Sequence, residues 1–241
     1  AQSDGPHGAR RPNIIVIVAD DLGYADVGFH GSTDVATPHI DALARQGVQF
    51  TSGYVTAPVC SPTRAGLLTG RYQQSFGHEF NPGAPNEAVP GFGLPLSETL
   101  LPRRLRSAGY RTGMVGKWHL GYGQGYLPLD RGFDHFFGFP GGSHSYIDAN
   151  LNPSNLIYRN TEPVDEKAYL TDAFGREAVR FIAEQKDTPY FLYLPFNAVH
   201  NPLQATEAYT SRFPGVADAR RRTFLAMLSA IDDAIGAVLD K

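Results

Sequence analysis

The sequence predicts an α/β fold in which a mostly parallel or mixed central sheet is flanked by helices. Two continuous apolar runs, at residues 13–19 and 189–196, are typical of strands that are buried on both faces of a parallel sheet. Strand-like and helix-like segments alternate along the chain, as they do in proteins whose parallel strands are joined by helices. With 241 residues, 42% of them hydrophobic, the chain is long enough to form a well-buried core.

The helices are predicted mainly from the residues at their ends. Thr37 is expected to cap the first helix, Pro38 occupies its first position and Gly47 ends it. Ser97 is expected to cap the third helix, and Gly109 is expected to end it. In chain order, the predicted helices cover residues 37–47, 61–70, 97–107, 169–185 and 218–239.

The strands are predicted from β-branched and aromatic residues between turn signals. Besides the two apolar runs, residues 48–56 and 110–116 fit this pattern. Residues 121–165 are rich in glycine, proline and aromatic residues and have little periodicity. They predict a long irregular excursion with short strands, of the kind that often carries function.

Composition excludes several classes of protein. A net charge of −3 and a pI near 6.2 argue against a nucleic-acid binder. No apolar run approaches the roughly 20 residues that span a bilayer. The chain begins without methionine and continues with a Gly/Pro/Arg-rich stretch, which suits an exported protein after removal of a signal peptide. We therefore expect a secreted or periplasmic protein with a flexible segment at 1–12 and one catalytic region at 13–241.

Three polar clusters follow predicted strands. Asp20 and Asp21 follow the first strand, residues 117–119 follow the strand at 110–116, and residues 197–200 follow the strand at 189–196. In open α/β sheets, ligands bind outside the carboxyl ends of the strands. Each cluster alone could be a solvated loop, but together they predict one shared site.

The carboxylates of Asp20 and Asp21 are neighbours in sequence. In isolation, an exposed loop in which Asp21 caps a turn explains them equally well. In a cleft, two adjacent negative charges need a compensating cation. Because Ca²⁺ and Mg²⁺ take carboxylate oxygens, the pair is a candidate site for a divalent cation that needs further ligands from elsewhere.

Cys60 is the single cysteine, so the chain can hold neither an internal disulfide nor a multi-cysteine metal site. A lone cysteine is by default a small buried hydrophobe. Here it precedes a Ser-Pro helix start, where backbone N–H groups favour an anion, and Arg64 lies one helical turn further on. A tyrosine-phosphatase loop would place the arginine six positions after the cysteine, so that chemistry fits poorly.

Lys117 and His119 flank Trp118 and, being two residues apart, could face the same side of an extended segment. A lysine supplies a permanent cation, and a histidine can donate or accept a proton. The competing interpretation is a surface lysine beside a histidine that faces the core. His200 likewise has a structural role as its default, whereas His39, His78 and His135 have no context that points to chemistry.

Taken together, these segments resemble the type I, formylglycine-dependent sulfatases of the alkaline phosphatase superfamily. Cys60-Ser-Pro-Thr-Arg64, followed by Ala-Gly-Leu-Leu-Thr-Gly-Arg71, matches the sulfatase motif Cys-x-Pro-x-Arg and its Leu-Thr-Gly-Arg continuation. Three further segments match in the expected order, at residues 13–23, 116–121 and 199–202. The resemblance covers residues 13 to 240 and implies the fold of that superfamily.

The resemblance implies a modified nucleophile. A formylglycine-generating enzyme would oxidise Cys60 to Cα-formylglycine, whose hydrate supplies the attacking hydroxyl. Asp20, Asp21 and the modified residue 60 would hold a divalent cation, expected to be Ca²⁺. Arg64 would hold the formylglycine, and Lys117 would stabilise its hydrate or a sulfate oxygen.

The resemblance also implies acid–base and substrate-binding roles. His119 is the candidate base for breakdown of the hemiacetal. His200 is the candidate donor to the sulfate or to the leaving oxygen, and Ser143 and His144 are candidates for the pocket wall. The implied activity is hydrolysis of a sulfate ester, in a sulfated carbohydrate or an aryl sulfate. Open alternatives are a phosphonate or phosphodiester hydrolase on the same scaffold and a non-catalytic protein that binds sulfated glycans.

In one respect the sequence departs from the family pattern. The family supplies two more metal ligands and a sulfate-binding lysine from segments that follow the last helix found here. No segment of the Ser-Asp-Asn-Gly type occurs in this chain. We therefore expect the sequence to correspond to the amino-terminal portion of a sulfatase catalytic domain, truncated before the carboxyl-terminal subdomain.

Overall fold

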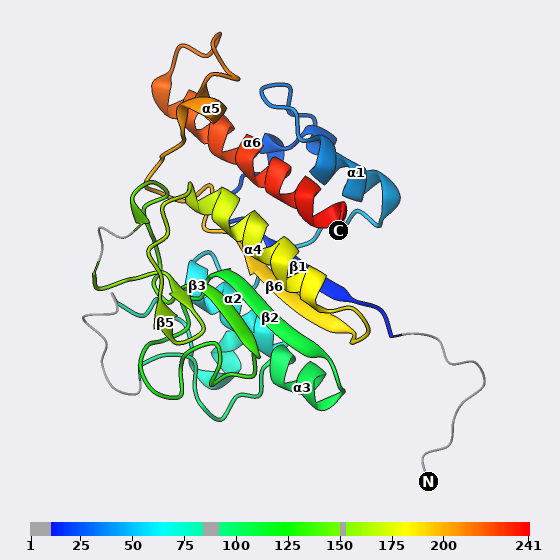
Figure 1. Ribbon diagram of the computed structural model, residues 1–241, viewed down its shortest axis with the longest axis vertical. Helices are drawn as coiled ribbons and strands as arrows, with labels where there is room; N and C mark the ends of the chain where they lie inside the picture. The colour runs from blue at the N-terminus through cyan, green and yellow to red at the C-terminus, as the bar shows by residue number, and fades with distance from the viewer. Residues whose placement is uncertain (1–10, 84–91, 150–152) are drawn as a thin grey trace, which may run out of the picture.

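A computed structural model describes residues 11–83, 92–149 and 153–241 (Figure 1). These residues form a six-stranded mixed sheet in the order β1-β6-β2-β3-β4-β5. The first four strands in this order are mutually parallel, and the last two add antiparallel pairs. The strands are β1 (Ile14–Val18), β2 (Arg111–Lys117), β3 (His135–Phe139), β4 (Tyr158–Arg159), β5 (Glu162–Pro163) and β6 (Tyr190–Pro195).

Helices cover both faces of this sheet. One hydrophobic cluster joins α4 and α6 to one face, and a second joins α2 to the other. In Figure 1, α4 crosses the front of the sheet and α6 lies beside α1. The α-helices are α1 (Pro38–Gln46), α2 (Cys60–Thr69), α3 (Leu101–Ser107), α4 (Leu170–Glu184), α5 (Glu207–Thr210) and α6 (Ala219–Leu239), and the 3₁₀ turns are η1 (Tyr24–Asp26), η2 (Gly28–His30) and η3 (Gln73–Phe76).

Strand β6 shows why apolar runs become central strands. Leu192 and Leu194 point into the cluster with α4 and α6, and Phe191 and Tyr193 point into the cluster with α2. Side chains alternate between the faces of a strand, so a strand that is covered on both faces needs apolar residues at every position. This confirms the α/β class and the two apolar strands that the sequence predicts.

The predicted strand at Val48–Thr56 is wrong. The structure has turns and irregular backbone there, and the apolar side chains of the segment are exposed. Strand propensity expresses how a residue packs against neighbouring strands, and within the described residues no strand pairs with this segment. The segment therefore has residues that favour strands, but it has no neighbouring strand with which to pair.

Two predicted helix caps also differ from the structure. Thr37 precedes α1, but its hydroxyl donates to Asp41 and accepts from the Gly28 amide, at 2.9 Å each, instead of capping. The third helix begins at Leu101, four residues after Ser97, because Pro102 lies in its first turn. The last helix agrees: Asp218 caps α6 by accepting from the amides of residues 220 and 221.

The excursion at residues 121–165 contains short strands, as the sequence predicts. One of them, β3, joins the main parallel sheet beside β2. Of the predicted flexible segment at 1–12, residues 1–10 lie outside the described residues. No helix in the described ranges has the length and apolar character needed to cross a membrane.

Candidate active site

The carboxyl ends of three parallel strands bring the polar clusters together. Asp20 follows β1 and Lys117 ends β2, on either side of β6. The Lys117 Nζ lies 2.5 Å from Asp20 Oδ2, and Arg64 Nη2 lies 3.4 Å from the same oxygen. All three side chains are buried, and Lys117 is completely inaccessible. One carboxylate thus lies between two cations, and all three side chains are largely shielded from solvent.

The electrostatic balance at Asp20 favours the charged form. Burial alone would raise the pKa of this carboxyl, but Arg64 and then Lys117 together outweigh it, so the pKa lies below its usual value. Asp20 is therefore ionised at neutral pH. Two cations against one anion leave the cluster with an excess positive charge, which suits an anionic substrate.

Arg64 connects helix α2 to the sheet. It lies one turn after Cys60 in α2, and its Nη1 donates to the Lys117 carbonyl oxygen at 2.8 Å. Its second amino group faces Asp20. Because a guanidinium can bind two acceptors at a fixed angle, Arg64 fixes the first turn of α2 against the end of β2.

Cys60 is the first residue of α2 and is half-buried. A hydrogen bond from the His200 side chain lowers the pKa of the thiol, with burial opposing and Lys117 assisting. The same hydrogen bond raises the pKa of His200, against the effect of burial. The two side chains thus form a polar pair in the lining of one cavity.

His119 lies beside this pair and is buried. Burial, followed by the positive charges of Lys117 and Arg64, lowers its pKa to about 3. The ring is therefore neutral at neutral pH, with one nitrogen as donor and one as acceptor. Its Nε2 lies 3.4 Å from the Pro82 carbonyl oxygen, and its Nδ1 has no hydrogen-bond partner among the described residues.

Asp21 differs from Asp20 in its surroundings. Its side chain is 62% exposed, and its Oδ2 lies 3.8 Å from His200 Nε2. Its φ of 59° is in the left-handed region, an uncommon conformation for a residue other than glycine. The turn after β1 thus presents one buried and one open carboxylate.

The two candidates for the pocket wall separate in the structure. Ser143 lines the same cavity as Cys60, His119 and His200. His144 is buried outside that lining, where its two ring nitrogens lie 2.9 and 2.6 Å from the carbonyl oxygens of residues 145 and 155. His144 therefore stabilises the loop that presents Ser143.

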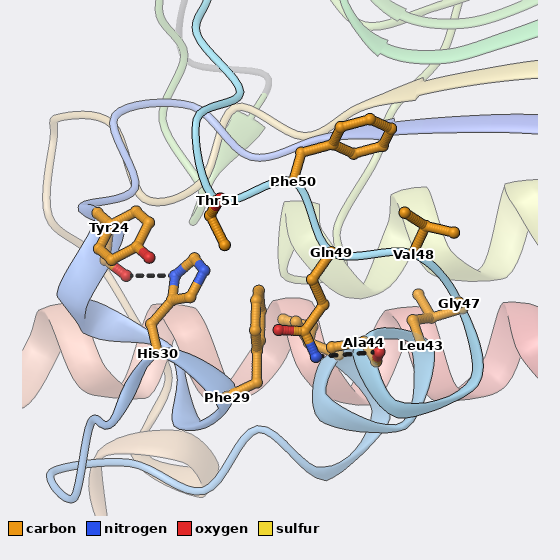
Figure 2. A pocket seen from close by; sticks show the side chains of 11 residues that line it. Tyr24, Phe29, His30, Leu43, Ala44, Gly47, Val48, Gln49, Phe50 and Thr51 are labelled. Atoms are coloured by element: carbon orange, nitrogen blue, oxygen red, sulfur yellow. Dashed lines mark hydrogen bonds between the residues drawn. The ribbon is translucent and has the colours of Figure 1, made fainter.

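The cavity at the site measures about 400 Å³. A larger hollow of about 530 Å³ lies between α1, the η1–η2 turns and residues 47–51 (Figure 2). There His30 Nδ1 bonds the Tyr24 carbonyl oxygen at 2.7 Å, and the described lining residues include neither a carboxylate nor a cysteine. The smaller cavity is therefore the one with groups suited to catalysis.

The family model named Sulfatase matches residues 12–241. The chain belongs to the sulfatase family. Mouse arylsulfatase J is 38% identical over 244 residues, covering 96% of this chain and 40% of the mouse protein. N-acetylgalactosamine-6-sulfatase of Sus scrofa is 37% identical, covering 95% of this chain and 46% of that protein. This sulfatase chain thus spans about half the length of these curated relatives.

A solved structure agrees with the fold. The crystal structure of Ps i-CgsB in complex with k-i-k-neocarrahexaose superposes with a TM-score of 0.91 and 40% sequence identity. The match covers 96% of this chain and 55% of Ps i-CgsB. The described sheet and helices thus closely follow the corresponding half of Ps i-CgsB.

The sulfatase family implies a divalent cation, and the described residues fit it only in part. Asp20 and Asp21 supply oxygens of the kind that Ca²⁺ prefers. However, Asp20 is already paired with Lys117 and Arg64. The described part of the chain holds no group of three or more His, Cys, Asp and Glu side chains that could bind a metal. By themselves, these residues are not a metal site.

Several polar residues at this site carried no signal in the sequence. Asn81 lines the cavity, and Asn155 both lines it and holds the loop by accepting from the Gly141 amide and donating to the Ser143 carbonyl oxygen. Nothing in the spacing of asparagines indicates these two positions, because loops that are distant in sequence bring them to the site. Asn197 belongs instead to the predicted polar cluster at residues 197–200; it is buried, and its side chain has no hydrogen-bond partner among the described residues.

Proposed function

We propose that this chain supplies the nucleophile-bearing part of a sulfuric-ester hydrolase that removes sulfate from a sulfated glycan. One observation carries the proposal: Cys60 begins a helix whose next turn, through Arg64, joins the buried Lys117–Asp20 pair. In this proposal residue 60 is the nucleophile at the wall of the cavity, and the buried cations Lys117 and Arg64 lie behind it.

The cations act on the sulfate group. A sulfate ester carries a negative charge that spreads further over its oxygens, and onto the leaving oxygen, as the ester bond breaks. Lys117 and Arg64 are held rigidly by Asp20 and by each other, so they can stabilise that charge with little rearrangement. Asp20 keeps both in place and does not itself need to change protonation.

Residue 60 provides the nucleophile. Oxidised to formylglycine, it would supply a geminal diol, which can attack sulfur and later expel sulfate by reforming the aldehyde. The hydroxyl oxygen loses its proton and forms a bond to sulfur while the bond from sulfur to the ester oxygen breaks, and the departing alcohol takes a proton. In this proposal His200 donates the proton to the departing alcohol, and His119, whose ring is neutral, accepts the proton of the second hydroxyl.

The remaining parts of the proposal follow from family membership. Asp20 and Asp21 contribute to a cation site, expected to be Ca²⁺, that the described residues do not complete. A formylglycine-generating enzyme is the maturation partner. Independently of family membership, we propose that the protein is secreted or periplasmic. A glycan substrate is supported by the two relatives whose names or structures concern sugars, N-acetylgalactosamine-6-sulfatase and Ps i-CgsB with a neocarrahexaose.

The test combines mass with activity. The full-length protein is produced together with a formylglycine-generating enzyme, and the peptide that contains Cys60 should lose about 18 Da on conversion. With Ca²⁺ present, sulfate release is then measured from sulfated galactan oligosaccharides, 6-sulfated N-acetylgalactosamine and 4-nitrophenyl sulfate. Converted protein that releases no sulfate from any of them would refute the proposal.

The same experiment separates the alternatives. Faster hydrolysis of matched 4-nitrophenyl phosphonate or phosphodiester substrates would indicate the phosphonate or phosphodiester reaction instead. An unmodified thiol in the native host, together with binding of sulfated oligosaccharides, would indicate a binding protein without catalysis.

A further inference from the structure

The helix that carries Cys60 is capped by a distant residue. Val59, at its N-cap position, has no side chain that can accept a hydrogen bond. Instead Asn81, twenty residues further along the chain, accepts the Ser61 amide hydrogen with its Oδ1 at 3.0 Å. An N-cap satisfies a backbone N–H that the helix itself leaves unpaired, so Asn81 stabilises the turn that presents Cys60.

The segment around Asn81 is fixed at two further points. The His78 Nε2 and the Ser61 Oγ lie 2.7 Å apart, and both side chains are fully buried. On the other side, the Pro82 carbonyl oxygen lies 3.4 Å from His119 Nε2. Residues 78–82 thus bridge the start of α2 and His119, and Asn81 lies between them.

The amide group of Asn81 has a second polar end. Asn81 lines the cavity together with Cys60, His119 and His200, and its side chain is exposed to that cavity. Its carbonyl oxygen is used by the helix, whereas its NH₂ group makes no hydrogen bond to any of the described residues. An amide NH₂ offers two donors and no acceptor, which suits an oxyanion.

We propose that Asn81 is a substrate-binding residue whose Oδ1 caps α2 while its NH₂ group donates to an oxygen of the bound sulfate. This assignment rests on the proposed function and adds a neutral donor to the cations Lys117 and Arg64. Because Oδ1 is held by Ser61, the NH₂ group needs little reorientation when the anion arrives. The Asn81 side chain then holds both the start of α2 and the sulfate group that the nucleophile attacks.

Two variants separate the cap from the donor. Asn81→Asp keeps an oxygen that can cap the helix and replaces the NH₂ donors by a negative charge. Ser61→Ala removes the buried hydrogen bond to His78 but leaves every residue of the cavity wall unchanged. Because the carboxylate of Asn81→Asp would also repel sulfate, the response of the Asn81 NH₂ signal in wild type decides whether this group itself contacts the anion.

The probe is inorganic sulfate, titrated into ¹⁵N-labelled protein at pH 7 and compared with sodium chloride at equal ionic strength. In wild type the side-chain NH₂ signal of Asn81, identified by its absence in Asn81→Asp, should shift together with the backbone signals of Lys117 and His119. Asn81→Asp should weaken sulfate binding by at least about tenfold, the effect of losing a charge-assisted hydrogen bond. Ser61→Ala should lower the melting temperature and change sulfate affinity by less than about twofold.

Two results would overturn the assignment in distinguishable ways. If Lys117 and His119 respond to sulfate but Asn81 does not, or if Asn81→Asp binds sulfate as tightly as wild type, Asn81 is only a cap and the proposed function survives. If none of these signals responds to sulfate in wild type, both the assignment and the proposed function fail.

Discussion

Two segments of this protein are both rich in apolar and β-branched residues, but one is a buried strand and the other is exposed and irregular. Residues 190–195 form β6, with Phe191, Leu192 and Leu194 completely buried. Residues 48–55 are also rich in β-branched and aromatic side chains, yet Val48 is 80% and Tyr54 88% exposed. Strand β6 lies between β1 and β2, whereas no strand among the described residues pairs with residues 48–55. The difference shows that pairing partners, more than local propensity, decide which apolar run becomes a strand.

The same comparison explains where the chemistry lies. The ends of β1 and β2 carry Asp20 and Lys117, and their burial depends on both strands packing against β6. The exposed segment leads into Cys60, but α2 is fixed separately by Arg64 and Asn81. The site thus lies at the ends of the well-packed strands, and the exposed segment at residues 48–55 precedes it in the chain. Four predictions test this contrast.

The largest effect is expected in the well-packed strand. Phe191→Ala should lower the free energy of unfolding by about 3–5 kcal/mol, because the truncation leaves a cavity beside the ring of Phe133. Urea denaturation followed by circular dichroism measures it. A loss below about 1 kcal/mol would show that β6 is no better packed than the exposed segment.

A somewhat smaller effect is expected at the strand ends. Asp20→Asn should cost about 3 kcal/mol at pH 7, because it leaves the inaccessible Lys117 ammonium without its anion. The pKa of Asp20 is lowered in the fold, so this contribution is complete above the unfolded value near pH 4 and is lost as the pH falls through the folded value. Asp21→Asn is the matched control, since its carboxylate is mostly exposed, and it should change stability by less than about 0.5 kcal/mol.

The buried histidine predicts a pH effect. Because the pKa of His119 is lowered to about 3, only the unfolded chain binds this proton between about pH 6.5 and pH 3. Acid therefore favours unfolding, and wild type should lose about 2 kcal/mol more than His119→Gln between pH 7.5 and pH 5. Urea denaturation at the two pH values gives both differences. Equal losses in the two proteins would mean that His119 titrates normally.

The smallest effect is expected in the exposed segment. Phe50→Ser should change the free energy of unfolding by less than about 0.5 kcal/mol, since the ring is 79% exposed at the edge of the hollow in Figure 2. It should also reduce the binding of a hydrophobic dye, because an exposed apolar patch is removed. Amide hydrogen exchange should be fast at residues 48–55 and slow in β6. Protection of both segments would contradict the contrast.

Sequence alone was sufficient where local signals and tertiary packing agree. Continuous apolar runs predicted β1 and β6 because a parallel strand needs apolar residues on both faces. The order of strands and helices predicted the sheet class, and polar residues after the strands predicted that Asp20 and Lys117 would lie at one edge. The motif around Cys60 and Arg64 carried the most specific part of the family resemblance, and three further segments in the expected order completed it.

Tertiary structure decided what depends on distant partners. Only the fold shows that Asp20 is engaged by two cations while Asp21 is open, and that His144 supports a loop instead of lining the cavity. Only the fold brings Asn81 to the helix of Cys60 and leaves residues 48–55 unpaired. The physical reason is the same in each case: burial, pairing and hydrogen bonds arise between segments far apart in the chain, and local sequence does not record them.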